Sequence, residues 1–246
     1  MTGGTIRLPQ PPAPQPMSAK RLFALLIPLA CAGLFIRLGV WQLARHQERV
    51  AFNMGLAERL AAAPVPLGSQ AGDTVGARWT QVTVSGFFRY DIEQLHASRI
   101  SNGSPGVHLL TPLERPGHDT LLLVTRGWVY AADAATADLP RWREGDFVTI
   151  SGYLVPMPDS GPLPPTDRPQ LIRSLNRRAI EARVGKPVYP VQLVMTSDSA
   201  ARADSVPRRL PLPTIDLGPH RSYAAQWFAF AVIAIVGGVV LFRRTR

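Results

Sequence analysis

The chain of 246 residues carries 27 Lys and Arg against 17 Asp and Glu, and 46% of its residues are hydrophobic. The formal net charge of +10 is unevenly distributed, because every acidic residue lies between two long apolar segments, where 18 basic residues nearly balance them. The surplus basic residues stand in or beside the apolar segments or on the tails, which is typical of a membrane protein and argues against a nucleic-acid partner. They are Arg7, Lys20, Arg21, Arg37, Arg45, Arg221, Arg243, Arg244 and Arg246.

Residues 1–20 are rich in proline and have no periodic apolar pattern, so we predict a disordered cytoplasmic tail. The first apolar segment follows, and we predict a transmembrane helix over residues 21–43. A cleaved signal peptide is one alternative, and a lipoprotein cleavage site before Cys31 is another. The latter would place Pro28 where leucine is expected, and the apolar run continues beyond Cys31, so an uncleaved helix is favoured.

Residues 44–220 are predicted to form an α+β domain outside the membrane. Residues 44–63 continue the first helix, and from Arg78 the apolar period changes to two, which indicates strands. A further helix is predicted over residues 174–184, with Ser174 as its N-cap. Strands that follow strands favour a mainly antiparallel sheet or a partly open barrel. The predicted strands cover residues 82–88, 107–113, 120–130, 147–155 and 188–195.

Proline-rich connectors occupy residues 155–169 and 206–219, and the second of these is predicted to run extended back to the membrane. The uncharged segment 222–242 comes next, and its 21 residues span about 31 Å as a helix, close to the thickness of a bilayer core. We predict a transmembrane helix over residues 221–242 and a basic cytoplasmic tail over residues 243–246. The chain is therefore expected in the inner membrane of a bacterium, with both termini in the cytoplasm and the middle domain in the periplasm.

No conventional catalytic motif is present, and a single cysteine cannot form a Cys-x-x-x-Cys copper site. The histidines of the middle domain, His96, His108 and His118, lack metal-ligand spacing and are predicted to be structural. Trp128 is predicted to pack within a strand in which Gly127 marks a bulge. The sequence therefore favours a protein that is not an enzyme.

Polar and aromatic residues gather at the predicted outer ends of both membrane helices. On the first helix, Arg37, Trp41 and Arg45 recur every four residues and so share a face, with Gln42 beside them. Anchoring at the membrane interface is a sufficient explanation for the tryptophan.

At the start of the second helix, His220, Tyr223 and Trp227 share a face, and the antiparallel direction of the two helices brings both clusters to the same depth. A neutral imidazole at the membrane edge is a suitable axial ligand for haem iron, and apolar helix faces could hold the porphyrin. Arg45 or Arg221 could pair with the haem propionates. Simple interfacial anchoring is the alternative explanation for this cluster.

Four short motifs follow one another in an order found in a known family. Together with the order of tail, helix, outer domain, helix and tail, they resemble the surfeit locus protein 1 family over residues 22–242. The motifs are Leu38-Gly39-x-Trp41-Gln42-x-x-Arg45, Pro105-Gly106 followed by Thr111-Pro112-Leu113, Arg126-Gly127-Trp128-Val129, and His220-x-x-Tyr223-Ala224-x-Gln226-Trp227-Phe228.

The resemblance implies a factor for the assembly of cytochrome c oxidase, which binds haem a at the outer membrane face and helps to insert it into the catalytic subunit. The family's functional histidine carries over to His220, while Arg126 and Trp128 carry over as motif positions. The expected partners are the oxidase catalytic subunit, a haem-synthesis enzyme and the lipid bilayer. The expected haem-binding residues are His220, which would bind the iron, and Tyr223, Trp227, Trp41 and Arg45.

Two other functions are compatible with the sequence. The chain could be a scaffold that binds oxidase subunits through its helices and outer sheet without carrying haem. It could also be a membrane-anchored enzyme or sensor, which would require a pocket of converging polar groups in the middle domain.

Overall fold

The computed structural model describes residues 19–68, 72–133, 136–163, 168, 170–196 and 206–244. Most of the predicted disordered tail and the last two residues of the predicted basic tail lie outside these ranges. The chain divides into two compact units, one made of Met1–Asn53 with Asp216–Arg246 and the other of Met54–Ile215. The first is referred to below as the helix unit and the second as the sheet unit.

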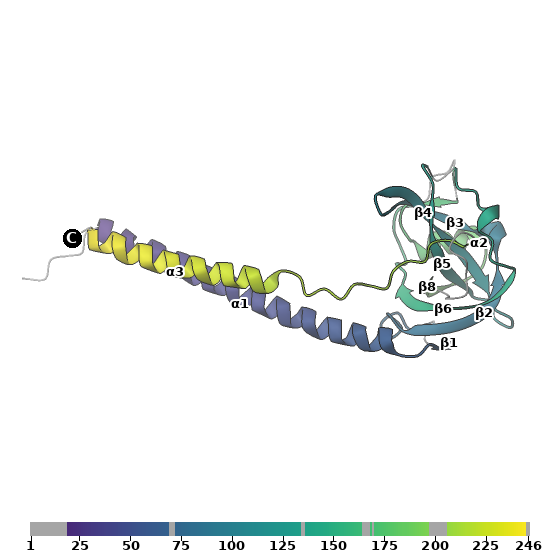
Figure 1. Ribbon diagram of the computed structural model, residues 1–246, viewed down its shortest axis with the longest axis horizontal. Coiled ribbons are helices and arrows are strands. Elements are labelled where there is room, and N and C mark those ends of the chain that lie inside the picture. Colours follow the sequence, from purple (N-terminus) through teal and green to yellow (C-terminus); the bar gives the residue numbers. More distant parts are fainter. Residues whose placement is uncertain are drawn as a thin grey trace, which may run out of the picture. The chain divides into compact units, whose positions relative to one another are not determined.

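The helix unit contains α3, His220–Arg244, and the greater part of α1, Ala19–Ala61, whose last turns belong to the sheet unit. The two helices lie side by side in this unit (Figure 1). They run antiparallel, since Gln42 of α1 meets the start of α3 while Pro28 packs on Gly238 near its end. Both helices are long and apolar enough to cross a membrane, judged by length and composition.

Small residues form the contact between α1 and α3. Ala224, Ala231 and Gly238 recur every seven residues on α3 and are buried, so they form a continuous stripe. On α1, a Cβ atom added to Gly39 would lie 2.6 Å from the ring of Phe228. The helices therefore approach closely because these positions carry small side chains or none.

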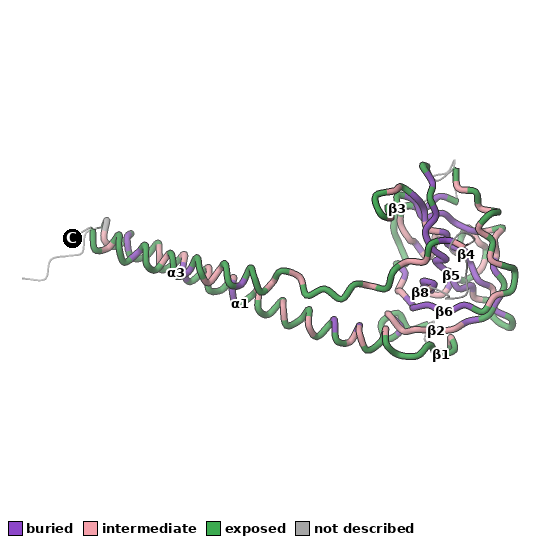
Figure 2. The backbone as a smooth tube through the Cα atoms, viewed as in Figure 1, coloured by how far each residue is buried: buried purple, intermediate pink, exposed green. Residues whose placement is uncertain are grey.

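Large apolar side chains cover the outward faces of both helices, along which Figure 2 shows mostly exposed residues. On α3, for example, Ile233 is 64% exposed and Val232 is 60% exposed. The core helix of a soluble protein would bury such residues, whereas a lipid bilayer solvates them. The two helices thus indicate a membrane protein, and the boundaries of the segments within the bilayer stay predictions.

Within its described residues, the sheet unit forms eight strands in the order β1-β2-β6-β8-β5-β4-β3-β7. Because β2 also pairs with β4, the strands β2, β6, β8, β5 and β4 close into a barrel (Figure 1). The pairs β1–β2, β3–β7 and β5–β8 are parallel, and the remaining pairs of described strands are antiparallel. The predicted fold class, an α+β domain with a mainly antiparallel, barrel-like sheet between two long helices, is confirmed. The strands are β1 (Val65–Pro66), β2 (Gln81–Phe88), β3 (Gln94–Ser101), β4 (Ser104–Glu114), β5 (Leu121–Tyr130), β6 (Phe147–Pro156), β7 (Leu171–Ile172) and β8 (Val188–Met195).

The barrel core follows from the alternation of side chains along the strands. On β2, Val82, Val84 and Phe88 are buried in the core cluster, and the residues between them are more exposed. β5 is buried along nearly its whole length because core packs on both of its faces. Leu122 belongs to the cluster shared with β2, and Leu123 to a second cluster beneath α2.

The short helix α2, Arg177–Val184, corrects one prediction. Its N-cap is Asn176 and not Ser174, because the Asn176 side-chain oxygen accepts a hydrogen bond of 3.2 Å from the backbone N–H of Ala179. Asn176 is 6% exposed and also donates to the backbone oxygen of Gly161 at 2.8 Å. The tertiary contact thus selects this cap, and Gly185 ends the helix with a left-handed φ of 69°.

Candidate functional site

His220 opens α3 and faces Gln42 on α1. The His220 Nδ1 atom lies 2.9 Å from Oε1 of Gln42, and because an amide oxygen only accepts, the imidazole donates through Nδ1. The neutral ring then carries its lone pair on Nε2, which has no hydrogen-bond partner among the residues that the structure describes. A hydrogen bond to the other ring nitrogen is how proteins orient a metal-binding histidine.

Aromatic residues continue from His220 along the same face of α3. Tyr223, Trp227 and Phe230 follow at helical spacing and are referred to as the aromatic stripe. Trp227 stacks on Phe35 of α1 with ring centroids 5.7 Å apart, and Phe230 lies 5.9 Å from both rings. These three rings line an apolar groove between the helices. The imidazole therefore stands at the head of an apolar, aromatic surface.

Trp41 and Arg45 lie one turn apart on α1, and both side chains are largely exposed. Trp41 is 54% exposed, and Arg45 forms an ion pair of 2.5 Å with Glu48 in which both side chains are also exposed. Among the described residues, no hydrogen bond or ring contact joins either residue to His220. The structure therefore brings His220 together with Gln42 and not with Trp41 or Arg45.

Two polar side chains of α1 hold the chain just before α3, a contact that the sequence analysis missed. The Arg49 Nε–H donates to the backbone oxygen of Asp216 at 2.9 Å, and the Asn53 amide donates to the same oxygen at 3.0 Å. The backbone N–H of Gly218, which has a φ of 66°, donates to the Asp216 carboxylate at 2.9 Å. This turn fixes the entry of the chain into α3 and hence the position of His220.

The residues around His220 fit the needs of a haem group. Haem iron takes an imidazole nitrogen, the porphyrin requires apolar walls, and the propionates pair with cations. Nε2 of His220 meets the first need, and the aromatic side chains that follow His220 along α3 offer apolar surface for the second. Arg45 could meet the third by exchanging its Glu48 partner, which costs little because an exposed ion pair is weak.

In the sheet unit, a buried ion-pair cluster surrounds Arg126 of β5, which is 0% exposed. Its guanidinium donates to Glu93 at 2.6 Å, to Glu144 at 3.0 Å and to the hydroxyl of Thr111 at 2.7 Å. Arg209 also donates to Glu144 and, at 2.7 Å, to the backbone oxygen of Arg126. Two guanidinium groups and two carboxylates thus balance one another, and the hydrogen bonds of Arg126 are directed to partners within the sheet unit.

Gly127 and Trp128 follow Arg126 in the same motif and contact the connector of residues 206–219, which leads to α3. The backbone N–H of Trp128 donates to Arg208 at 2.7 Å, and the N–H of Arg208 donates back at 2.9 Å. Gly127 has a φ of 153°, and a Cβ atom there would lie 2.5 Å from the Arg208 backbone oxygen. The predicted bulge is confirmed by a shift of the β4–β5 register at this point, and the predicted packing of Trp128 by its 7% exposure.

His96 and His108 form a ring pair across β3 and β4, with centroids 6.1 Å apart. Burial, together with a smaller contribution from the positive charge of Arg99, lowers the pKa of each histidine to about 4. Both rings are therefore neutral at pH 7. In the described part of the chain, no group of three His, Cys, Asp or Glu side chains is placed to hold a metal ion.

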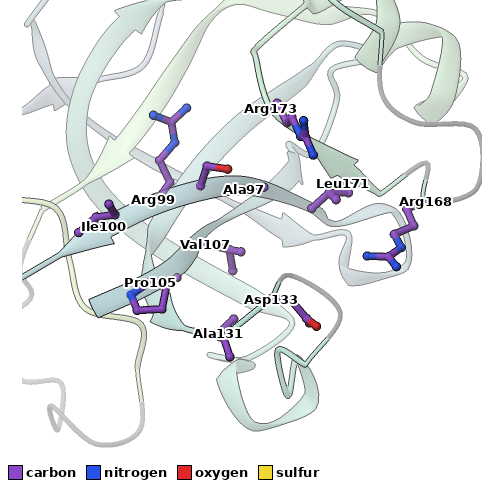
Figure 3. Close-up of a pocket in the computed structure, with 13 residues that line it drawn as sticks. Ala97, Arg99, Ile100, Pro105, Val107, Ala131, Asp133, Arg168, Leu171 and Arg173 are labelled. Atoms are coloured by element: carbon purple, nitrogen blue, oxygen red, sulfur yellow. The ribbon is translucent and has the colours of Figure 1, made fainter. Parts of the chain in front are cut away.

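A cavity of about 400 Å³ lies beside the ends of β3 and β4 (Figure 3). Val107, Ala131 and Leu171 contribute apolar walls. The charged residues of the lining are Asp133, Arg99, Arg168 and Arg173. Ser98 also belongs to the lining, and no histidine or cysteine is among the described lining residues.

Comparison with known proteins finds that the sequence model described as "SURF1 family" matches residues 29–232. An uncharacterized SURF1-like protein of Mycobacterium tuberculosis is 28% identical over 214 residues, which cover 82% of this chain and 76% of that protein. A SURF1-like protein of Mycobacterium bovis shows the same values. Surfeit locus protein 1 of Mus musculus is 28% identical over 121 residues, which cover 44% of this chain and 38% of the mouse protein.

Proposed function

Because this chain belongs to the SURF1 family, a family linked to the assembly of cytochrome c oxidase, we propose that it is a membrane-anchored assembly factor for a haem–copper terminal oxidase. Its proposed task is to hold haem a at the outer membrane face and to help insert it into the catalytic subunit. The proposed location is the inner membrane of a bacterium, with the sheet unit in the periplasm and both termini in the cytoplasm. The basic residues at both chain ends support this orientation.

The observation that carries the proposal is the hydrogen bond between His220 and Gln42 at the head of the aromatic stripe. An imidazole that donates through Nδ1 to an amide oxygen is oriented and directs the Nε2 lone pair to a ligand. Interfacial anchoring alone would require aromatic rings but no such bond across 178 residues of sequence. The arrangement therefore supports a ligand-binding role for His220 beyond anchoring.

A carrier must release its cargo, and the side chains around His220 suit this requirement. His220 would hold the haem iron as one protein ligand, which a ligand of the receiving subunit could replace. Tyr223 is 46% exposed and Trp41 is 54% exposed, so this end of the helix unit presents accessible side chains to a partner. A haem-synthesis enzyme is the proposed donor, and the oxidase catalytic subunit is the proposed acceptor.

The proposal is tested in a bacterium that lacks this protein and is supplied with wild-type or variant genes. The His220→Ala variant is expected to reach wild-type levels in the membrane, while the haem a content of the purified oxidase falls severalfold. His118→Ala removes an exposed histidine of the sheet unit and is the matched control, with unchanged haem content expected. Full haem loading with His220→Ala would contradict the carrier role and leave a haem-free scaffold as the function.

A further inference from the structure

Arg115 is a buried cation without an acidic partner in the part of the chain that the structure describes. The residue is 8% exposed. The Cζ atom of its guanidinium lies 5.2 Å from the centroid of the Tyr189 ring, and its Nη2 atom donates to the Tyr189 hydroxyl at 2.5 Å. A longer bond of 3.3 Å reaches the backbone oxygen of Leu67. The Nε atom is buried without a hydrogen-bond partner, and no carboxylate of the described residues lies within ion-pair distance.

Two other guanidinium groups of the sheet unit have acidic partners in its interior. Arg126 and Arg209 share carboxylates in their cluster. A buried cation is strongly unfavourable unless an anion and further hydrogen bonds compensate for its lost hydration. The described surroundings of Arg115 provide two hydrogen-bond acceptors, but they provide no acceptor for Nε and no anion.

Arg115 lines a cavity of about 390 Å³ between the end of β1, the middle of β2 and the turn that joins β4 to β5. The turn runs from Arg115 through Pro116 and Gly117 to His118, whose backbone N–H donates to the Arg115 oxygen at 3.1 Å. Proline at the second position and glycine with a φ of 75° at the third fit a type II turn. This rigid turn places Arg115 and His118 in the lining of the same cavity.

We propose that this cavity binds a small molecule with a carboxylate or phosphate group, held by Arg115 and, as a second contact, by His118. The planar guanidinium is suited to both anions because it donates two parallel hydrogen bonds. Pro66, Leu67 and Pro116 provide apolar walls for the rest of the ligand. The site lies within the sheet unit and does not depend on the haem proposal.

The test measures thermal unfolding of the full-length, detergent-purified protein at constant ionic strength. Chloride is replaced by inorganic phosphate or by butyrate, and 1-butanol serves as the uncharged counterpart of butyrate. At about ten times the dissociation constant, an anion that binds is expected to raise the unfolding midpoint by about 3 °C, and butanol is not. A response to phosphate alone or to butyrate alone identifies the preferred anion.

The shift is expected to vanish in Arg115→Gln, to shrink in Arg115→Lys and in His118→Ala, and to persist in Arg178→Gln. The last variant removes an exposed positive charge of α2 and so controls for net charge. If Arg115→Gln does not fold, Arg115→Lys and His118→Ala decide the question. The proposal is wrong if neither anion shifts the midpoint, if butanol has the same effect as butyrate, or if these variants respond as wild type does.

Discussion

His220 and Arg126 are both residues of family motifs, and their surroundings give them different roles. Arg126 is fully enclosed and directs its hydrogen bonds to partners in its own cluster, so it stabilises the sheet unit. His220 uses one ring nitrogen for Gln42 and has the other without a partner among the described residues. A side chain with a held orientation and an unused lone pair is suited to bind a ligand.

Gln42 is expected to increase the affinity for haem because it orients the His220 imidazole. In Gln42→Leu, the imidazole loses its orienting acceptor, and haem affinity is expected to fall about 10- to 100-fold, as for other partners of metal-binding histidines. Gln47→Leu is the matched control, because Gln47 lies on an exposed part of α1. Titration of both purified variants with haem measures the difference. Equal affinities would show that the His220–Gln42 bond has no part in binding.

The low pKa values of His96 and His108 predict that stability depends on pH. Each folded-state pKa is about 4, below the ordinary value of 6.5, so the unfolded chain binds more protons between these values. Stability is therefore fully present above pH 6.5 and falls as the pH drops toward 4, by about 1–2 kcal/mol for each histidine after allowance for partial solvent screening.

Denaturant unfolding at pH 4.5 and 7 checks this dependence. His108→Gln, which cannot titrate, is expected to lose less stability than wild type between these two pH values. Arg178→Gln, at an exposed position of α2, leaves both histidines in place and is expected to behave as wild type does. An unchanged pH dependence in His108→Gln would contradict the assigned role of burial.

At the scale of elements, apolar alternation and apolar runs predicted five strands, and the strands with neither pattern were missed. β2 and β8 were located within one residue of their observed ends, because their apolar residues recur along the strand. β3 was missed because it contains Gln94, His96 and Arg99, polar residues that are accommodated by tertiary partners. The two-residue strands β1 and β7 are too short for any period to show.

The candidate site could be predicted only in part, because some of its contacts join residues that are far apart in the sequence. The faces of the two membrane helices could be predicted from helical spacing. The partner of His220 could not, because the contact with Gln42 depends on how α1 and α3 pack through their small residues. The Asp216 turn, held by Arg49 and Asn53, depends on the same packing.

Gly127 is expected to be needed for the backbone bridge that holds the connector to α3 against β5. In Gly127→Ala, the new methyl group would meet the Arg208 backbone oxygen, so the bridge to Trp128 should open. Trypsin cleavage after Arg208 or Arg209 is expected to become about tenfold faster, since protease attack follows the population of opened chains. Gly55→Ala, which meets no atom within 4 Å, is the matched control. Unchanged cleavage would show that the bridge does not protect the connector.

At the scale of the whole molecule, the distribution of charge and of apolar residues supports a membrane protein with two spans. The acidic residues are confined to the segment between the apolar helices, and the two tails carry basic residues and no acidic ones. This pattern fits cytoplasmic termini and a periplasmic sheet unit. The family match over residues 29–232 includes most of α1, the whole sheet unit and half of α3.

Cysteine labelling tests the proposed orientation. The natural Cys31 lines the apolar groove of the helix unit and is expected to react poorly with a membrane-impermeant thiol reagent. A cysteine introduced as Asp119→Cys in the sheet unit should react in intact spheroplasts, and one introduced as Arg244→Cys should react only after the membrane is opened. The reverse pattern would place the sheet unit in the cytoplasm.

Chemical rescue tests most directly whether His220 binds the haem iron. The visible absorption spectrum of detergent-purified wild-type protein from cells that make haem a is compared with that of His220→Gly, before and after incubation with haem a and imidazole and removal of unbound haem. We expect a Soret band in the wild type, its loss in the variant, and its return when imidazole fills the space left by the side chain and haem a is supplied with it. A Soret band that is unchanged in His220→Gly would contradict iron binding by His220.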